Sequence, residues 1–441
     1  MASTGSETHL RQVAAAVIGN ALEWYDFIVF GFMAAIISPV FFPAGDAYAA
    51  LLLTTASFGV GFVMRPVGGI LIGIHADRRG RKSALQLIIA LMALATALLA
   101  FAPPYTAIGV GSSLIVVIAR MLQGLATGGE FASSTALLIE LAPAGRRGLY
   151  GSWQMVGQGL ALLAGTAIGA LITHLLSPVQ LHAWGWRIPF AIGLLIAPVG
   201  FWIRRHLQEP GTAAVAGRQP RDSRPPARPP MVPTLSHHGR ALLSSALLTA
   251  SVTIAFYVLV IYMPTFANRS LGIALDAAFG SQCVAVLAMT LVTPFAGAAS
   301  DRIGRRPLIV ASLVGYFLLL LPLFGWLLAA PGAARLMITQ IVLCCVLGLF
   351  LGPYAAAIAE QFPARIRSTG MAISYNITVM IFGGFAQFFL TLLLHATGSP
   401  LSLAFYLLFG AALGIVGSLL LGARDESAAQ SGQLAESVGR H

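Results

Sequence analysis

Charged residues are scarce in this sequence. Only 9% of its 441 residues are Asp, Glu, Lys or Arg, whereas 57% are hydrophobic and the mean hydropathy is +0.84. A soluble globular domain usually carries about 25% charged residues. The composition therefore excludes an ordinary soluble protein and predicts a chain that is covered mostly by lipid.

Cysteine and cofactor motifs are also in short supply. Cys283, Cys344 and Cys345 are the only cysteines. Each lies in an apolar run, and the adjacent pair has poor geometry for a mutual bridge, so we expect free, buried thiols. The sequence has no His and Cys cluster typical of a metal site and no G-x-x-x-x-G-K-[S/T] loop for ATP. We expect no metal, no cofactor and no enzymatic activity.

Long apolar runs are abundant instead. A helix needs about 20 residues to cross a bilayer, and twelve runs approach or exceed that length. A barrel would require alternating segments of about ten residues, a pattern that the sequence lacks. We therefore predict an all-α integral membrane protein with twelve transmembrane helices. The runs are 13–41, 47–75, 83–102, 112–140, 149–176, 187–206, 240–268, 277–299, 307–329, 334–361, 368–395 and 401–423.

The cations are distributed unevenly between the connecting segments. Most of the 26 Lys and Arg residues fall in alternate segments, whereas the intervening ones hold only Arg187, Arg269 and Arg335. The bias of short loops predicts that both termini are cytoplasmic, in a bacterial-type inner membrane. The net charge of +11 therefore reflects topology. Nucleic-acid binding would need a basic folded face with interleaved aromatics, so we expect none.

The middle of the chain is rich in proline. Residues 207–239 contain seven prolines and scattered arginines, which is typical of a flexible cytoplasmic linker. The linker divides the chain into an N-terminal six-helix half, 1–206, and a C-terminal six-helix half, 240–423. A short, polar cytoplasmic tail, 424–441, has no heptads that would indicate a dimerising module.

The two halves contain related sequences. G-I-H-A-D-R-R-G-R-K begins at Gly73 and G-A-A-S-D-R-I-G-R-R begins at Gly297, which is 224 positions later. E-L-A-P-A-G-R-R at Glu140 likewise resembles E-Q-F-P-A-R-I-R at Glu360. This duplication predicts two pseudo-symmetric, parallel repeats. At the offset of the second pair, Arg120 corresponds to the neutral Gln340, so we single out Arg120 as a departure from symmetry.

The sequence contains an ordered set of motifs besides the two charged loops. They are G-N-A-L-E-W-Y-D-F at 19–27, R-P-V-G-G at 65–69, R-M-L-Q-G at 120–124, G-G-E at 128–130, W-G-W-R-I-P-F at 184–190, Y-M-P-T-F at 262–266 and Y-N-I-T-V-M-I-F-G-G at 375–384. This set resembles the major facilitator superfamily, and within it the metabolite–proton symporter branch. The resemblance implies the twelve-helix fold of that family and alternating access. Members of the branch carry citrate and other tricarboxylates, 2-oxoglutarate, shikimate, or proline and betaines with protons. Several relatives have a proline shortly after the Gly383-Gly384 pair, whereas this chain reads Phe385-Ala386-Gln387.

Polar residues recur along the first span. Asn20, Glu23 and Asp26 are three positions apart and so lie on one helical stripe. An acid in hydrocarbon must pair, become protonated or line a wet cavity, which makes Glu23 and Asp26 candidate proton carriers. The alternative is that either acid is a static partner of Arg65 or Arg120.

Arg120 and Gln123 are candidates for substrate binding. A guanidinium keeps its proton and can hold a carboxylate with two hydrogen bonds. The alternative for Arg120 is a purely structural ion pair with the first span. The resemblance adds Tyr257, Tyr375 and Asn376, in segments that resemble the cavity-lining seventh and eleventh spans, although such residues often only join helices. Asn20 completes this set.

Further charged residues are candidates for gating. Arg65, before Pro66, suits a structural or gating role, and Glu130 is expected at the inner gate. Glu140 and Glu360 are expected to pair with Arg81 and Arg305 respectively. The alternative is that the loop cations only orient the protein. The loop candidates are Asp77, Arg78, Gly80, Arg81, Asp301, Arg302, Gly304 and Arg305.

These observations together predict a proton-coupled importer of a small organic anion, a di- or tricarboxylate such as citrate or 2-oxoglutarate. Its partners are the anion, protons and the lipid bilayer, and we expect a functional monomer. The alternatives are a proton symporter for a zwitterion such as proline or betaine, or for shikimate. A proton-driven exporter is a weaker alternative, because the fifth span lacks a Gly-Pro kink motif, and a non-transporting receptor of this fold is weaker still.

Overall fold

The computed structural model of the protein describes residues 3–79, 81–128, 130–194, 238–363 and 366–421. Within these ranges the regular structure is helical and no strand is present. The prediction of an all-α protein is therefore confirmed. The predicted linker lies outside the described residues except for its last two positions, and the predicted tail, 424–441, lies entirely outside them.

The first part of the chain forms a bundle around α1, α3 and α8. A π-helical turn, η1, precedes a further helical segment at 187–194. The elements are α1 (Ser3–Phe32), α2 (Ala34–Phe41), α3 (Ala47–Arg79), α4 (Arg81–Ala100), α5 (Tyr105–Ile108), α6 (Val110–Thr127), α7 (Glu130–Leu141), α8 (Arg147–Leu175), α9 (Pro178–Gln180) and η1 (Leu181–Gly185).

The second part forms a matching bundle. Two π-helical turns, η2 and η3, interrupt its helices. The elements are α13 (Gly239–Phe256), η2 (Tyr257–Tyr262), α14 (Met263–Leu271), α15 (Leu275–Ile303), α16 (Arg305–Ala329), α17 (Ala333–Ala359), α18 (Arg367–Val379), η3 (Met380–Gly384), α19 (Ala386–Thr397) and α20 (Ser402–Leu420).

Each of the twelve predicted apolar runs coincides with at least one described helix. Nine described helices are long and apolar enough to cross a membrane, or ten if the bent pair Val17–Phe32 and Ala34–Phe41 is one span. The axes of this pair differ by 65°. The third run has a shorter apolar helix, Gln86–Ala100, and the sixth is described only over 187–194. The length and apolar composition of the described helices therefore identify nine or ten of the twelve predicted spans.

The helix interruptions have local causes. η2 is followed by Pro264, which has no N–H and whose ring crowds the carbonyl four residues earlier, so the preceding turn widens. η3 ends at the Gly383-Gly384 pair, where the helix is weakest. The helix is therefore interrupted at this point even though the proline found in several relatives is missing.

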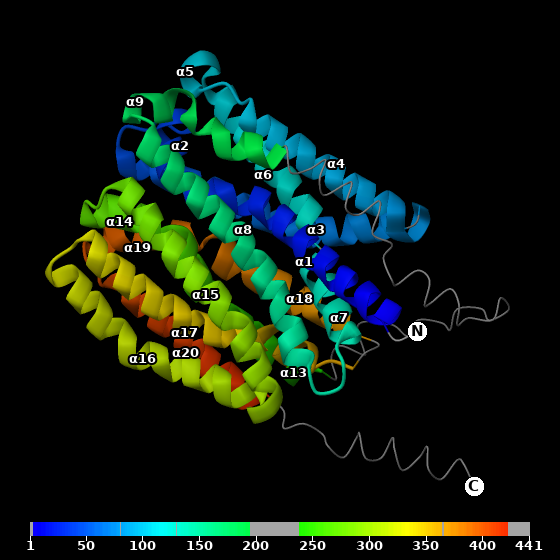
Figure 1. The fold of residues 1–441 in the computed structure, drawn as a ribbon. Helices are drawn as coiled ribbons and strands as arrows, with labels where there is room; N and C mark the ends of the chain where they lie inside the picture. The colour runs from blue at the N-terminus through cyan, green and yellow to red at the C-terminus, as the bar shows by residue number, and fades with distance from the viewer. Residues whose placement is uncertain (1–2, 80, 129, 195–237, 364–365, 422–441) are drawn as a thin grey trace, which may run out of the picture.

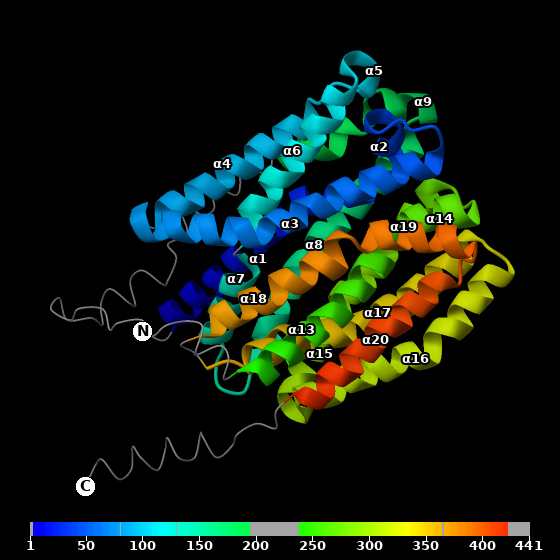
Figure 2. The same ribbon diagram turned by 180° about the vertical axis from the view of Figure 1, so that it is seen from behind.

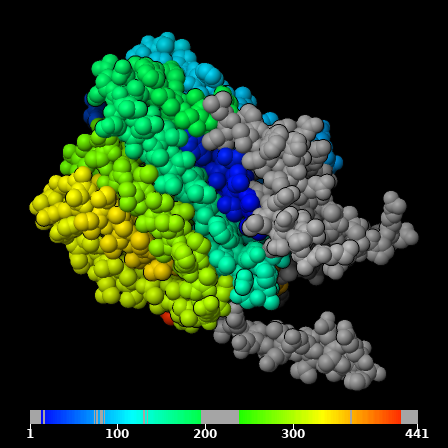
Figure 3. All heavy atoms as spheres, viewed as in Figure 1, coloured from blue at the N-terminus to red at the C-terminus, as the bar shows by residue number. Residues whose placement is uncertain are grey.

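The two bundles lie side by side, and long helices of both, such as α8 and α15, run in much the same direction (Figures 1 and 2). α15 packs extensively on α8 across the interface, and α3 packs on η3 and α19. In the space-filling view the side chains of the two bundles meet directly (Figure 3). The C-terminal ends of α3, α7 and α15 lie at one end, which we call the charged end. α5, α9 and α14 lie at the opposite end.

The cysteines differ in their surroundings. None of the three is bridged, as expected, and Cys344 is buried. Cys283 and Cys345 are only half-buried, which corrects the expectation that all three are buried. Neighbouring residues on a helix point about 100° apart, so Cys344 and Cys345 cannot both face the core.

Candidate functional site

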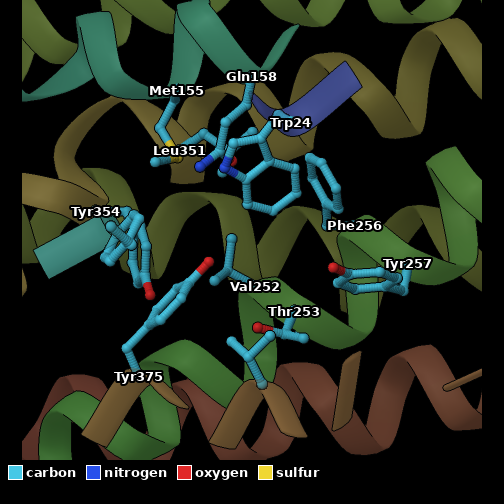
Figure 4. Close-up of a pocket in the computed structure, with 12 residues that line it drawn as sticks. Trp24, Met155, Gln158, Val252, Thr253, Phe256, Tyr257, Leu351, Tyr354 and Tyr375 are labelled. Atoms are coloured by element: carbon cyan, nitrogen blue, oxygen red, sulfur yellow. The ribbon is translucent and has the colours of Figure 1, made fainter. Parts of the chain in front are cut away.

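A small cavity of about 30 Å³ lies between the two bundles (Figure 4). Ligand pockets for small molecules begin at roughly 300 Å³, so this cavity has room for a water molecule or two and would have to widen around a substrate. Trp24 and Gln158 border it from the first bundle, and Tyr354 and Tyr375 lie across from Phe256 and Tyr257 in the second. Its lining consists of Trp24, Phe131, Met155, Gln158, Val252, Thr253, Phe256, Tyr257, Leu351, Tyr354, Tyr375 and Val379.

The cavity wall is mainly aromatic and uncharged, and two of its polar groups have no hydrogen-bond partner. These are the Gln158 Nε2 amide and the Tyr257 hydroxyl, both fully enclosed. The hydroxyl of Tyr354, by contrast, lies 2.9 Å from that of Thr249. Because buried polar groups are normally paired, the two unpaired groups are available to a ligand. The sequence interpretation included Tyr257 but missed Gln158.

Arg120 lies behind this wall, within the first bundle. Its side chain is completely buried in α6, and its guanidinium donates to the carbonyl of Phe27 at 3.1 Å and to Gln123 Oε1 at 2.5 Å. Three rings surround the guanidinium carbon, with centroids at 4.5 Å for Phe27, 4.9 Å for Phe30 and 4.7 Å for Phe58. Arg120 is therefore held by a carbonyl, an amide and aromatic faces.

Arg65 occupies a similar environment in α3. Its Nε donates to Thr127 Oγ1 at 3.1 Å, and its guanidinium carbon lies 4.7 Å from the centroid of Phe27 and 4.9 Å from that of Phe62. Trp24, which lines the cavity, is 5.9 Å away. Phe27 thus contacts both guanidinium groups, and two buried cations share one ring.

Neither cation has an anionic partner in the described part of the chain. The ion pairs found there involve only Arg305 and His174, and three guanidinium nitrogens, Nε and one terminal nitrogen of Arg120 and one terminal nitrogen of Arg65, have no hydrogen-bond partner. The described part of the chain therefore contains no static ion pair between Arg120 and an acid of the first span.

Asp26 is buried but does not line the cavity. Its backbone carbonyl accepts a hydrogen bond from Gln123 Nε2 at 3.2 Å. Its Oδ1 lies against Gly193, so close that a side chain at Gly193 would overlap it. Gln123 therefore bonds both the guanidinium of Arg120 and the backbone of the residue that carries this carboxyl. Asn20 is buried against Gly157 of α8, and Glu23 is half-buried.

Near the middle of α3, side chains fill glycine positions of the partner bundle. A Cβ at Gly59 of α3 would lie 2.5 Å from the ring of Phe385, and one at Gly384 of η3 would lie 2.6 Å from Phe62. Phe385 directly follows the Gly383-Gly384 pair, shortly before the position at which several relatives have a proline. The two bundles approach this closely because both positions lack a side chain.

The charged end is closed by hydrogen bonds and ion pairs. Asp301 accepts from the backbone N–H groups of Gly148 and Leu149, at 2.8 and 2.9 Å, and from Arg305 at 2.8 Å. Arg305 also donates to both carboxylate oxygens of Glu360, at 3.3 and 3.0 Å. Asp301 thereby connects α15 to the first turn of α8 in the other bundle. The two bundles are thus joined at the charged end and again near the middle of α3.

Comparison with known proteins identifies the family. A profile of the Major Facilitator Superfamily matches residues 18–378. The chain belongs to the major facilitator superfamily.

Several relatives cover nearly the whole of this superfamily member. The citrate-proton symporter of Salmonella typhi is 36% identical, over 91% of this chain and 92% of its own. The alpha-ketoglutarate permease of Escherichia coli K12 is 33% identical, over 95% of both chains. The proline/betaine transporter of Salmonella typhimurium LT2 is 30% identical, over 92% of this chain and 82% of its own.

A solved structure of the superfamily shares the fold. A crystal structure of a D-xylose-proton symporter superposes with a TM-score of 0.72, at 19% identity, over 93% of this chain and 97% of the other. The prediction of the twelve-helix fold of the major facilitator superfamily is thereby confirmed.

Of the remaining predicted site residues of this superfamily member, Tyr375 lines the cavity and stacks on Phe131, with centroids 3.9 Å apart. Asn376 is half-buried and donates to the carbonyl of Gly128 at 2.8 Å, which joins the bundles. Gly304 adopts φ +95°, which favours glycine.

The other predicted gating residues are at the charged end. Arg78, Glu140 and Arg302 are exposed. Gly80 lies outside the described residues. Asp77, Arg81 and Glu130 lie in α3, α4 and α7, but their side chains are outside the description, so the predicted pairing of Glu140 with Arg81 stays a prediction.

Proposed function

We propose that this protein is a secondary active transporter that imports a small organic anion together with protons. The substrate is a di- or tricarboxylate such as citrate or 2-oxoglutarate. The observation that carries this proposal is the pair of buried cations, Arg65 and Arg120, which have no anionic partner in the described chain and lie behind an uncharged cavity. A carboxylate substrate supplies the missing negative charge. The names of the citrate and alpha-ketoglutarate relatives support the same class.

The substrate site in this proposal combines the cavity with the cations behind it. Tyr257 and Gln158 offer hydrogen bonds from the cavity wall, and Tyr375 contributes an aromatic face. Arg120, oriented by Gln123, holds a substrate carboxylate once the intervening rings move. Asn20 and Asn376 lie at the margins of the site. Asn20 packs against Gly157 of α8, and Asn376 donates to the carbonyl of Gly128.

Proton coupling in this proposal involves Asp26, with Glu23 as the second candidate. Asp26 is buried and linked to Arg120 through Gln123. A proton on Asp26 neutralises the carboxyl of the residue whose backbone carbonyl binds Gln123, and Gln123 in turn presents the Arg120 guanidinium to the substrate. Loss of the proton to the cytoplasm restores the negative charge of Asp26 and favours release of the substrate. Binding and protonation are thus coupled through one amide.

Transport in this proposal proceeds by alternating access. The halves 1–206 and 240–423 rock about the central cavity, while the linker 207–239 and the tail 424–441 stay cytoplasmic. The charged end faces the cytoplasm of an inner membrane, and in the described state the two bundles are joined at that end. Asp301, Arg305 and Glu360 form the inner gate, which closes when the cavity opens outward. One chain contains the complete site, so the monomer suffices.

The test is transport by the purified protein in proteoliposomes. Citrate, 2-oxoglutarate, succinate, shikimate, proline and betaine are offered with and without an inward proton gradient. We expect carboxylate uptake that rises with the gradient. Arg120→Gln should abolish it, whereas Arg306→Gln, which removes an exposed cation, should not. Full carboxylate affinity and proton coupling in Arg120→Gln would refute the proposal.

A zwitterion symporter is the second candidate. The ring-lined cavity favours it, because aromatic faces bind quaternary ammonium groups, and one relative is a proline/betaine transporter. Uptake of proline or betaine alone in the same experiment would select this candidate over the carboxylate.

A further inference from the structure

Five aromatic rings form a cage around the two buried cations. Each guanidinium group has three ring centroids within 6 Å, and Phe27 is shared. These rings lie in α1 and α3, close together in the first bundle. The cage consists of Trp24, Phe27, Phe30, Phe58 and Phe62.

The cage occupies the place that an anion would take. Unpaired charges inside a membrane protein are costly, and the described chain offers neither cation a carboxylate. The negative face of an aromatic ring attracts a cation, and the attraction is strongest where water is excluded. The rings therefore stabilise two charges that the protein itself leaves uncompensated.

The cage also separates the cations from the cavity. Phe58 and Phe62 pack on each other, with centroids 5.3 Å apart, and both contact the ring of Tyr257 at 6.2 and 5.7 Å. Tyr257 lines the cavity, whereas Phe58 and Phe62 do not. A substrate carboxylate must therefore replace rings of the cage to reach Arg65 or Arg120.

We propose that the cage is an internal substitute for the substrate's charge, which allows the empty transporter to change its orientation. A symporter must return empty after each delivery, and in that step no anion accompanies Arg65 and Arg120. The cage stabilises both cations during this return. In the loaded step the substrate does so instead. This inference rests on the proposed function, because it requires an anionic substrate.

The prediction separates two kinds of flux. Net uptake includes the return of the empty protein, whereas exchange of labelled for unlabelled substrate does not. Phe30→Leu removes a ring that contacts Arg120 and does not line the cavity. It should slow net uptake about tenfold or more, while exchange changes less than about twofold. Phe62→Leu, beside Arg65, should act in the same direction and provides a second variant if the first folds poorly.

The matched control is Phe324→Leu. Phe324 is fully buried in the second bundle and packs on Phe266, with no guanidinium group over its ring among the described contacts. Its loss should leave the ratio of uptake to exchange unchanged. All variants are compared in proteoliposomes at matched reconstitution, with citrate and 2-oxoglutarate as probes.

Three results would overturn the inference. If a cage variant lowers uptake and exchange by the same factor, the rings serve packing only. If both fluxes stay at the wild-type level, the cage has no part in the return step. Absence of any carboxylate flux in the unsubstituted protein would instead refute the proposed function, and this inference with it, so the two failures are distinguishable.

Discussion

Asp301→Asn should open the charged end of the molecule. In the structure the two carboxylate oxygens of Asp301 accept from the N–H groups of Gly148 and Leu149, in the first turn of α8. The N-cap residue of that helix, Arg146, makes no capping bond of its own. Asp301 therefore caps a helix of the opposite bundle, and its charge lies at the positive end of the helix dipole.

The size of the effect follows from these contacts. The Asn amide has one oxygen, so one N–H loses its acceptor, which costs about 1–3 kcal/mol in a buried site. Loss of the negative charge at the helix N-terminus adds roughly 0.3–1 kcal/mol. A total of about 1.3–4 kcal/mol changes the balance between closed and open charged ends by roughly 10- to 900-fold.

Distances between spin labels measure this balance. Arg146→Cys and Arg306→Cys place labels at exposed positions on the two sides of the gate, in a background without the three native cysteines. Pulsed electron resonance should show a shift toward longer distances in Asp301→Asn. Arg302→Gln, which removes a neighbouring exposed charge, is the control and should leave the distribution unchanged. Equal distributions in Asp301→Asn and the unsubstituted protein would show that the capping contact does not hold the gate.

Three other substitutions probe the packing and the coupling. Gly124→Ala should destabilise the protein by about 1–3 kcal/mol, because its Cβ would overlap the Gly61 carbonyl, and should therefore lower the melting temperature in detergent. An unchanged melting temperature would contradict the close approach of α3 and α6. Gly59→Trp should overlap the ring of Phe385, force α3 away from the second bundle and stop transport; retained transport would argue against the close approach of the bundles at this point. Asp26→Asn should remove the rise of uptake with external acidity but keep exchange, and uptake that still follows the proton gradient would exclude Asp26 as the proton carrier.

The sequence predicted the spans because their cause is local. A run of apolar residues long enough to cross a bilayer identifies a helix without reference to the rest of the chain. The pairing of Arg305 with Glu360 could also be anticipated, since both belong to repeated motifs at the same end of the fold. These predictions needed only length, composition and duplication.

The arrangement of the site could not be derived in this way. The stripe of Asn20, Glu23 and Asp26 predicts which face of α1 is polar, but it does not predict which residues pack on that face. Protein surrounds α1 on several sides, so that Trp24 lines the cavity while Asp26 lies against Gly193. The approach of Arg65 to Arg120 depends on contacts between α1, α3 and α6. Gln158 was missed because a single amide in an apolar helix carries no pattern.

The two regions of contact between the bundles are built from different interactions, and this gives the protein a sensitivity to salt. At the charged end, closure depends on ion pairs and a carboxylate at a helix terminus, which dissolved ions screen over about 8–10 Å. Near the middle of α3, the contact depends on rings that fill glycine positions, and excluded salts such as sulfate strengthen such apolar contacts. Rising ionic strength therefore weakens the charged end while it preserves or tightens the contact between the rings and the glycines. The salt content of the solution at the charged end in this way controls how readily that end of the empty protein opens.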